Sequence, residues 1–198
     1  FLPLSNKKWT WIIDPLDGTK DFLNGTDEFA IHIALLYEKK PILGVVVLPA
    51  LEELWFGVKN LGVWYENRAG VKVSDFKNKN KLDELILISS KNHKNKDLNN
   101  ILAKFSCKKV YAGSIGYKIC SILKGSADVY ISVSGKTAPK DWDIAAPAFI
   151  LEEAGGIFCE INSKSLNYLN INYEQKGCLI AARDNKTYLF ALEVIKIK

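Results

Sequence analysis

Two carboxylates three residues apart follow a short apolar run near the start of the chain. Residues 9–13 (WTWII) predict a strand that ends at Asp14, because a proline follows, and Asp17 comes next in the sequence DPLDGT. The same six residues contain the backbone carbonyl of Leu16 and the hydroxyl of Thr19. Clustered hard oxygens of this kind suit Mg²⁺. An ordinary Pro-Leu-Asp-Gly turn is the alternative, but it accounts for neither Asp14 nor Thr19.

Two further segments offer polar groups at the starts of predicted helices. Asp143 lies in the sequence DWDIAAP, just before a run of small and apolar residues that predicts a helix over 144–154. It is either an ordinary N-cap or a carboxylate that points at a metal. Gly113 and Ser114 join a predicted strand to a predicted helix, where free backbone N–H groups can bind phosphate. Taken alone, Ser114 as a simple N-cap is the commoner case.

The elements that would position these residues fall into two different halves. Short apolar and β-branched runs in residues 1–75 predict a mainly antiparallel sheet, and the polar stretch 75–82 predicts a linker. Strand and helix patterns alternate over 83–198, which indicates an α/β half with some parallel pairing. The predicted fold class is therefore α/β. The expected strands are 9–13, 29–37, 42–48, 54–56, 63–65, 85–89, 109–112 and 128–133, and the expected helices are 97–105, 114–124 and 144–154.

Composition excludes several classes of protein. The chain has 198 residues, of which 48% are hydrophobic and 25% charged, as expected of a folded globular protein. The net charge of +5 comes from scattered basic residues, so no nucleic-acid partner is expected. No apolar run is long enough to cross a membrane and no signal peptide is visible, which predicts a cytoplasmic location. The four widely spaced cysteines predict free thiols there.

Together these segments resemble the inositol monophosphatase superfamily. The motifs DPLDGT, GS before a helix, WD followed by small residues, and EAGG occur in this order from Trp9 to beyond Gly156. Each motif is weak alone, but the ordered set is specific. The resemblance implies a layered α-β-α-β-α fold in the complete family and Mg²⁺-dependent hydrolysis of a small phosphomonoester, with two or more Mg²⁺ ions and sensitivity to Li⁺.

Within that family the chain is most similar to the 3′(2′),5′-bisphosphate nucleotidases of the CysQ type. The sequence KDF at residues 20–22 follows DGT as in that subfamily. Residues 130–136 carry no carboxylate of the kind that holds inositol hydroxyls, and Lys136 offers a cation for a second phosphate. Ser132 departs from the pattern, since nucleotidases of this type often have Arg or Lys there.

The resemblance also implies roles for individual residues. The metal ligands would be Asp14, the carbonyl of Leu16, Asp17 and Asp143. Asp17 and Thr19 would be catalytic, with the Thr19 hydroxyl orienting the attacking water. The substrate would contact Gly18, Thr19, Gly113, Ser114, Lys136 and Asp143.

Several alternatives stay open at this point. The favoured substrate is 3′-phosphoadenosine 5′-phosphate or its sulfated relative. Inositol monophosphate or a sugar bisphosphate is the alternative within the class, and an inactive metal-binding regulatory or scaffold protein is the alternative outside it. A homodimer is not excluded, whereas a membrane partner is not expected.

The start of the chain carries a separate expectation. The family places a Glu ligand in a helix upstream of the first Asp, but only 13 residues precede Asp14. We therefore expect a helical N-terminal segment to be missing and this chain alone to be inactive. We also expect Trp9, Trp11 and Ile13 to expose apolar surface.

Overall fold

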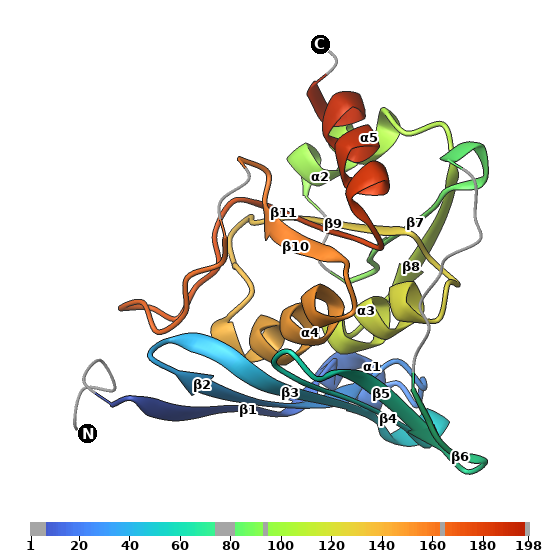
Figure 1. Cartoon of the computed structure of the whole chain (residues 1–198). Coiled ribbons are helices and arrows are strands. Elements are labelled where there is room, and N and C mark those ends of the chain that lie inside the picture. Colours follow the sequence, from blue (N-terminus) through green and yellow to red (C-terminus); the bar gives the residue numbers. More distant parts are fainter. Residues whose placement is uncertain (1–6, 74–81, 93–94, 163–164, 197–198) are drawn as a thin grey trace.

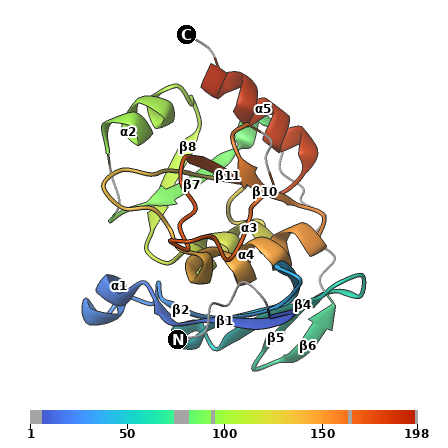
Figure 2. The same cartoon turned by 90° about the vertical axis from the view of Figure 1, so that its left-hand side faces the viewer.

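The computed structural model describes residues 7–73, 82–92, 95–162 and 165–196, and it is layered. One sheet lies below a layer formed by two helices, a second sheet lies above that layer, and two further helices cover the top (Figure 1 and Figure 2). The predicted α/β class is confirmed. No helix in these ranges is long and apolar enough to cross a bilayer.

The first sheet is a six-stranded antiparallel meander with its strands in chain order. Its strands are β1 (Trp9–Asp17), β2 (Ala30–Tyr37), β3 (Lys40–Leu48), β4 (Glu53–Val58), β5 (Gly62–Asn67) and β6 (Gly70–Val73). Alternate residues of β2 are buried, as the period of two along a strand requires. The antiparallel pairing expected for the first part of the chain is confirmed.

The second sheet is mixed and has the strand order β10-β11-β9-β7-β8. Its strands are β7 (Ile86–Ser90), β8 (Lys108–Ala112), β9 (Val129–Val133), β10 (Ile157–Glu160) and β11 (Cys178–Ala182). β7 runs parallel to both β8 and β9, so the predicted parallel pairing is confirmed. Parallel neighbours need crossover connections. Helix α2 (Lys96–Ala103) connects β7 to β8, and α3 (Ile115–Leu123) connects β8 to β9.

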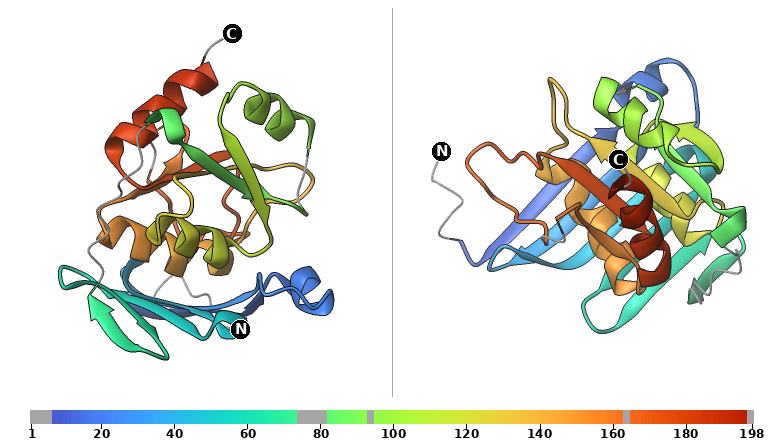
Figure 3. Two further views of the ribbon diagram at one scale, coloured as in Figure 1. Left: turned by 90° about the vertical axis from the view of Figure 1, so that its right-hand side faces the viewer. Right: turned by 90° about the horizontal axis from the view of Figure 1, so that it is seen from above.

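Helix α4 (Asp141–Glu153) lies between the two sheets and is apolar on nearly all sides. A helix of that kind must be buried. It packs against five strands of the first sheet, β1 to β5, and against β10 of the second. At Gly44 of β3 the approach is so close that a Cβ atom would lie 3.0 Å from the carbonyl oxygen of Ala146. On the outer face of the second sheet lie α2 and α5 (Asn185–Lys196), as Figure 3 shows.

One buried apolar cluster takes residues from both sheets and from α3 and α4. Because this cluster joins both parts of the chain, it does not mark residues 1–75 and 83–198 as separate units. The division of the chain into these halves stays a prediction. Of the predicted linker 75–82, all but Leu82 lies outside the described residues. The four cysteines are free thiols, as predicted, and Cys120 and Cys159 are buried.

Two predicted boundaries were wrong, and both corrections concern the candidate site. Strand β1 continues past Pro15 to Asp17, whereas the sequence predicted its end at Asp14. An edge strand tolerates proline at a bulge, and β1 has a register shift between Asp14 and Asp17. Helix α4 begins at Asp141 rather than 144, because the carboxylate of Asp143 accepts a hydrogen bond from the backbone N–H of Lys140 at 2.7 Å.

The outer face of β1 is exposed. Trp9, Trp11 and Ile13 are 57%, 57% and 55% exposed, while Thr10 and Ile12 point inward and are buried. The expectation that these three side chains expose apolar surface in this chain is confirmed. Successive side chains of β1 thus alternate between a buried face, which packs on the core, and an exposed face.

Candidate active site

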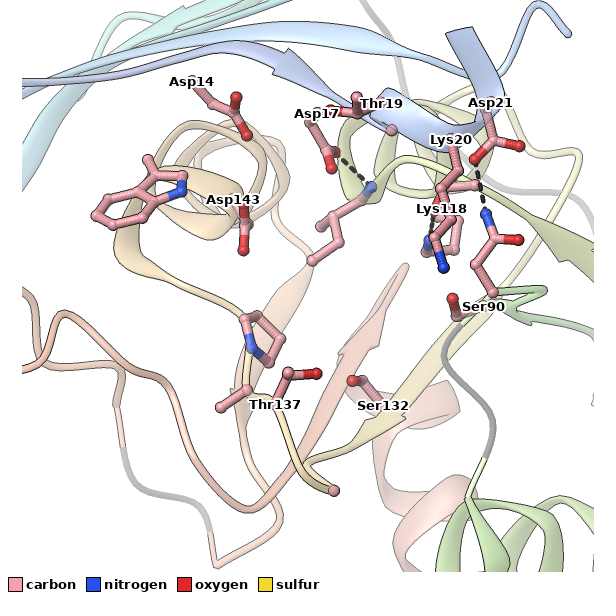
Figure 4. Close-up of a pocket in the computed structure, with 18 of the residues that line it drawn as sticks. Asp14, Asp17, Thr19, Lys20, Asp21, Ser90, Lys118, Ser132, Thr137 and Asp143 are labelled. Carbon is pink, nitrogen blue, oxygen red and sulfur yellow. Dashed lines mark hydrogen bonds between the residues drawn. The ribbon is translucent and has the colours of Figure 1, made fainter. Parts of the chain in front are cut away.

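Three carboxylates converge where the end of β1 meets the first turn of α4. One oxygen from each of Asp14, Asp17 and Asp143 lies within 4.8 Å of the others, and Figure 4 shows the side chains facing one another. We call these residues the carboxylate cluster. The bulge in β1 helps to form this cluster. Asp14 pairs with His32 and Asp17 pairs with Ala30, so three residues along β1 lie opposite two residues along β2. Negative groups this close fit a hard cation such as Mg²⁺.

Asp17 is held by the N-terminus of α3. Its Oδ2 accepts hydrogen bonds from Ser114 Oγ at 2.6 Å, from the backbone N–H of Ile115 at 2.6 Å, and from that of Gly116 at 3.2 Å. The positive end of a helix stabilises such a charge. The sequence predicted that this helix start would hold phosphate, but its N–H groups hold a carboxylate of the protein itself. All three bonds end on Oδ2, so α3 does not engage the other oxygen of Asp17.

Ser114 therefore has a different place from the one predicted. Its side chain is fully buried, and besides donating to Asp17 it caps α3 by accepting from the N–H of Tyr117. It does not line the cavity described below. The predicted direct contact between Ser114 and substrate does not fit this geometry. Its neighbour Gly113 does line the cavity.

The acidity of Asp143 is strongly perturbed. Burial first, and then the nearby charges of Asp17 and Asp14, raise its pKa to about 7 against the opposing effect of the hydrogen bond from the N–H of Lys140. Without a cation, this carboxyl is largely protonated below neutral pH. A divalent ion would favour the charged form, which supports a metal at this position.

The pKa of Asp143 predicts how metal binding depends on pH. A ligand carboxylate must be deprotonated, so we expect Mg²⁺ affinity to fall as the pH drops below about 7, by about tenfold per pH unit. Calorimetric titration with MgCl₂ between about pH 5.5 and about pH 8.5 measures this. A constant affinity across that range would contradict the assignment.

The metal-free protein should show the opposite trend. The folded-state pKa of Asp143 lies above its ordinary value of 3.8, so the folded state binds the extra proton. The free energy of unfolding should therefore fall as the pH rises from about 4 to about 7. Asp143→Asn should remove both trends, which makes it the control for each.

The turn after the first two carboxylates is tightly constrained. Gly18 has φ of 89°, and a Cβ atom there would lie 2.9 Å from the carbonyl oxygen of Glu28. This position requires glycine. The short helix α1 (Thr19–Leu23) follows, and Thr19 Oγ1 donates to the carbonyl oxygen of Leu16 at 3.1 Å. Leu16, Gly18 and Thr19 all face the cavity.

The carboxylate cluster forms one wall of a cavity of about 750 Å³. That volume is large enough for a ligand the size of a nucleotide. Across the cavity from the cluster lie Ser132 and Thr137 (Figure 4). Lys136, which precedes Thr137 in the chain, also lines the cavity. The other lining groups include Lys20, Ser90, Asn92, Asn95, Lys118 and Trp142.

Lys118 was not predicted as a site residue. It is only 1% exposed, and its ammonium group donates to the carbonyl oxygen of Gly113 and lies 5.3 Å from the centre of the Tyr130 ring. Burial lowers its pKa to about 8, although the charges of Asp17 and Asp21 oppose that shift. Its position four residues after the N-cap of α3 is the only sequence feature that points to the cavity.

Asp21 belongs to the sequence KDF that suggested the nucleotidase subfamily, and in the structure it connects neighbouring segments. It is 1% exposed, and it accepts from Lys91 Nζ at 2.5 Å and from Asn92 Nδ2 at 2.9 Å. A Cβ atom on Gly113 would lie 2.0 Å from its Oδ2. Asp21 therefore ties α1 to the loop after β7 and to the start of α3.

Known proteins with similar sequences come from one family. Residues 2–196 match the model of the inositol monophosphatase family. The chain is 34% identical over 158 residues to a 3′(2′),5′-bisphosphate nucleotidase CysQ of Buchnera aphidicola, covering 80% of this chain and 57% of the relative. It is 32% identical over 162 residues to a fructose-1,6-bisphosphatase/inositol-1-monophosphatase of Aquifex aeolicus, covering 78% and 58%. The chain thus spans less than two thirds of the length of both relatives.

Solved structures show the same fold. An inositol monophosphatase from Zymomonas mobilis has a TM-score of 0.82 at 26% identity, with 97% of this chain and 72% of that chain covered. CysQ from Bacteroides thetaiotaomicron has a TM-score of 0.80 at 24% identity, with 91% and 72% covered. The resemblance seen in the ordered motifs is therefore confirmed, and the chain belongs to the inositol monophosphatase family.

Proposed function

We propose that this protein hydrolyses a small phosphomonoester with the help of Mg²⁺. The observation that carries the proposal is the carboxylate cluster, whose three ligand oxygens lie within 4.8 Å of one another at the wall of a polar cavity. Phosphoryl transfer needs little from a protein beyond positioning and charge neutralisation. Membership of the inositol monophosphatase family supports the same reaction class.

In this proposal the carboxylate cluster and the carbonyl of Leu16 hold two or more Mg²⁺ ions. When bound, the ions neutralise charge on the phosphoryl oxygens and acidify the attacking water. Thr19 Oγ1 gives its own hydrogen to Leu16, so its lone pairs can accept a hydrogen from that water. This contact would turn a lone pair of the water toward phosphorus. Gly18 and Thr19 offer their backbone to the phosphate at the same turn.

The reaction needs no covalent intermediate with the protein. The water oxygen bonds to phosphorus, the bond from phosphorus to the alcohol oxygen breaks, and the alcohol leaves with a proton supplied by the water. Inorganic phosphate is the second product. Asp17 acts in this scheme as a metal ligand and not as a nucleophile, and three hydrogen bonds from the start of α3 to its Oδ2 fix its orientation.

We infer that the favoured substrate is a nucleoside bisphosphate such as 3′-phosphoadenosine 5′-phosphate. Opposite the cluster, the cavity offers the hydroxyls of Ser132 and Thr137. Lys136, the neighbour of Thr137 in the chain, also lines the cavity and adds a cation suited to a second phosphate. The CysQ relative named as a bisphosphate nucleotidase supports this substrate. The Aquifex relative supports the alternative, an inositol phosphate or a sugar bisphosphate.

A panel of phosphoesters tests the substrate in the whole protein. At fixed Mg²⁺, we expect kcat/KM for 3′-phosphoadenosine 5′-phosphate to exceed that for inositol 1-phosphate by about tenfold or more, because a charged hydrogen bond to the second phosphate is worth about 1.5–3 kcal/mol. Lys136→Met should shrink the ratio of the two values toward one. A higher value for inositol 1-phosphate would make the nucleotide assignment wrong. Metal binding without phosphate release from any ester would favour the inactive regulatory protein.

A further inference from the structure

A buried histidine lies directly behind the carboxylate cluster. His32 is on the inward face of β2, is 1% exposed, and pairs in register with Asp14 of β1. The structure places its ring between the two elements that carry the carboxylates, the end of β1 and the start of α4.

Each ring nitrogen of His32 faces one of those elements. Nδ1 lies 3.3 Å from the carbonyl oxygen of Trp142, the residue before Asp143. A carbonyl oxygen only accepts hydrogen bonds, so Nδ1 carries the hydrogen of this contact. Nε2 lies 3.5 Å from Asp17 Oδ2. It is one of three buried side-chain polar atoms in the described residues that have no hydrogen-bond partner.

The ring also sets how close α3 can come. A Cβ atom on Gly116 would lie 2.2 Å from His32 Nε2 and 3.0 Å from its Cδ2, so only glycine fits against the ring. Gly116 belongs to the first turn of α3, whose N–H groups hold Asp17. One imidazole thus contacts the start of α3, the start of α4 and the side chain of Asp17.

We propose that His32 is a positioning residue that sets the spacing between Asp17 and Asp143. The inference rests on the proposed metal centre. An apolar side chain of the same volume would offer no hydrogen-bond donor to the Trp142 carbonyl. A buried nitrogen without a hydrogen-bond partner, such as Nε2, is uncommon in folded proteins, and a positioning role explains its presence here. Groups that orient metal ligands from behind typically change metal affinity by about 10–100-fold when they are replaced.

Three substitutions separate the contacts of the ring. His32→Asn keeps a donor near the position of Nδ1, His32→Gln keeps a polar group near Nε2, and His32→Leu keeps only the volume. Binding is measured in the full chain with Mn²⁺ as the probe, by the loss of the free-ion paramagnetic resonance signal, without substrate. We expect His32→Leu to weaken Mn²⁺ binding by about tenfold or more. The Mn²⁺ affinity of His32→Asn should stay within about threefold of that of the unaltered protein, and the affinity of His32→Gln should lie between the two.

Two outcomes would overturn the proposal. One is unaltered affinity in His32→Leu, and the other is an Asn variant as weak as the Leu variant, since the donor to Trp142 would then be irrelevant. Leu36→Val is the matched control, because Leu36 is fully buried on the same face of β2. It should lower the melting temperature without changing Mn²⁺ affinity.

A second pair of variants tests the steric contact. As a single change, Gly116→Ala should weaken Mn²⁺ binding. In a protein that already carries His32→Ala, the same change should have little further effect, because the imidazole ring that obstructs the new methyl group is gone. Such non-additivity is expected only of side chains that touch. Additive effects of the two changes would contradict the contact.

Assays of activity distinguish failure of this proposal from failure of the proposed function. In His32→Leu the Mg²⁺ concentration for half-maximal rate should rise about tenfold, with kcat at saturating Mg²⁺ much less affected. If the unaltered protein released no phosphate while the three variants kept the expected order of Mn²⁺ affinity, the phosphatase function would fail and the positioning role would stand.

Discussion

Replacing Asp143 with Asn should abolish Mg²⁺-dependent phosphate release while the fold persists. An amide oxygen carries no charge, so the proposed metal centre loses one of three anionic ligands, and we expect a loss of about 10³ or more in rate. The fold should persist because an Asn oxygen can still accept the hydrogen bond from the N–H of Lys140 that starts α4. Removing a buried charge from beside Asp14 and Asp17 also relieves repulsion in the metal-free state.

Asp14→Asn should behave in the same way. Its side chain also has a local structural role, since Asp14 Oδ1 accepts from the N–H of Leu16 at 3.0 Å, and Asn can keep that bond. Phosphate release measured together with circular dichroism separates chemistry from folding. Asp97→Asn, an exposed carboxylate on α2, is the matched control and should keep its activity. Near-normal turnover in either cluster variant would remove that residue from the metal centre.

The largest expected loss of stability comes from a different buried pair. Asp128 is fully buried, its carboxylate pairs with the guanidinium of Arg183, and it also accepts from the N–H of Ile86 at 2.7 Å. Arg183→Met keeps apolar volume but removes the guanidinium that pairs with the Asp128 carboxylate. Breaking a buried pair from one side costs about 3–5 kcal/mol, so we expect a loss of that size in the free energy of unfolding.

Equilibrium unfolding in urea measures this loss. The double variant Asp128→Asn with Arg183→Met should recover part of it, because the buried charge of Asp128 is then removed together with that of Arg183. Mn²⁺ affinity below the unfolding transition should stay unchanged, since Asp128 precedes β9 at the end opposite Ser132. A single-variant loss under about 1 kcal/mol would mean that water reaches the pair.

Local patterns predicted much of this molecule. β2 and β3 have clear period-two or β-branched runs, and α3 begins after a good N-cap at Ser114, so all three were predicted within two residues of their observed bounds. The ordered motifs also predicted that Asp14, Asp17 and Asp143 belong to one site, and the structure brings them together. Their roles in metal binding stay predictions.

The features that sequence reasoning missed depend on contacts between distant segments. Asp17 meets the start of α3 at a separation of 97–99 residues, and nothing in DPLDGT indicates that its carboxylate is already bound. Lys118 is expected on the surface by residue type, and only the packing of α3 buries it. Helix α4 shows no amphipathic period from which to read its start, because it is enclosed on nearly all sides.

The position of α4 between the two sheets has a consequence for the order of folding. The contact between His32 and the Trp142 carbonyl closes a loop of 110 residues, and it requires the first sheet to be packed on α4. Contacts so distant in sequence form slowly, after the local hairpins of β1 to β6. The carboxylate cluster is therefore completed late, and a half-folded chain offers its acidic side chains to a cation only one or two at a time. The metal affinity that we propose for this protein would therefore be a property of the finished fold alone.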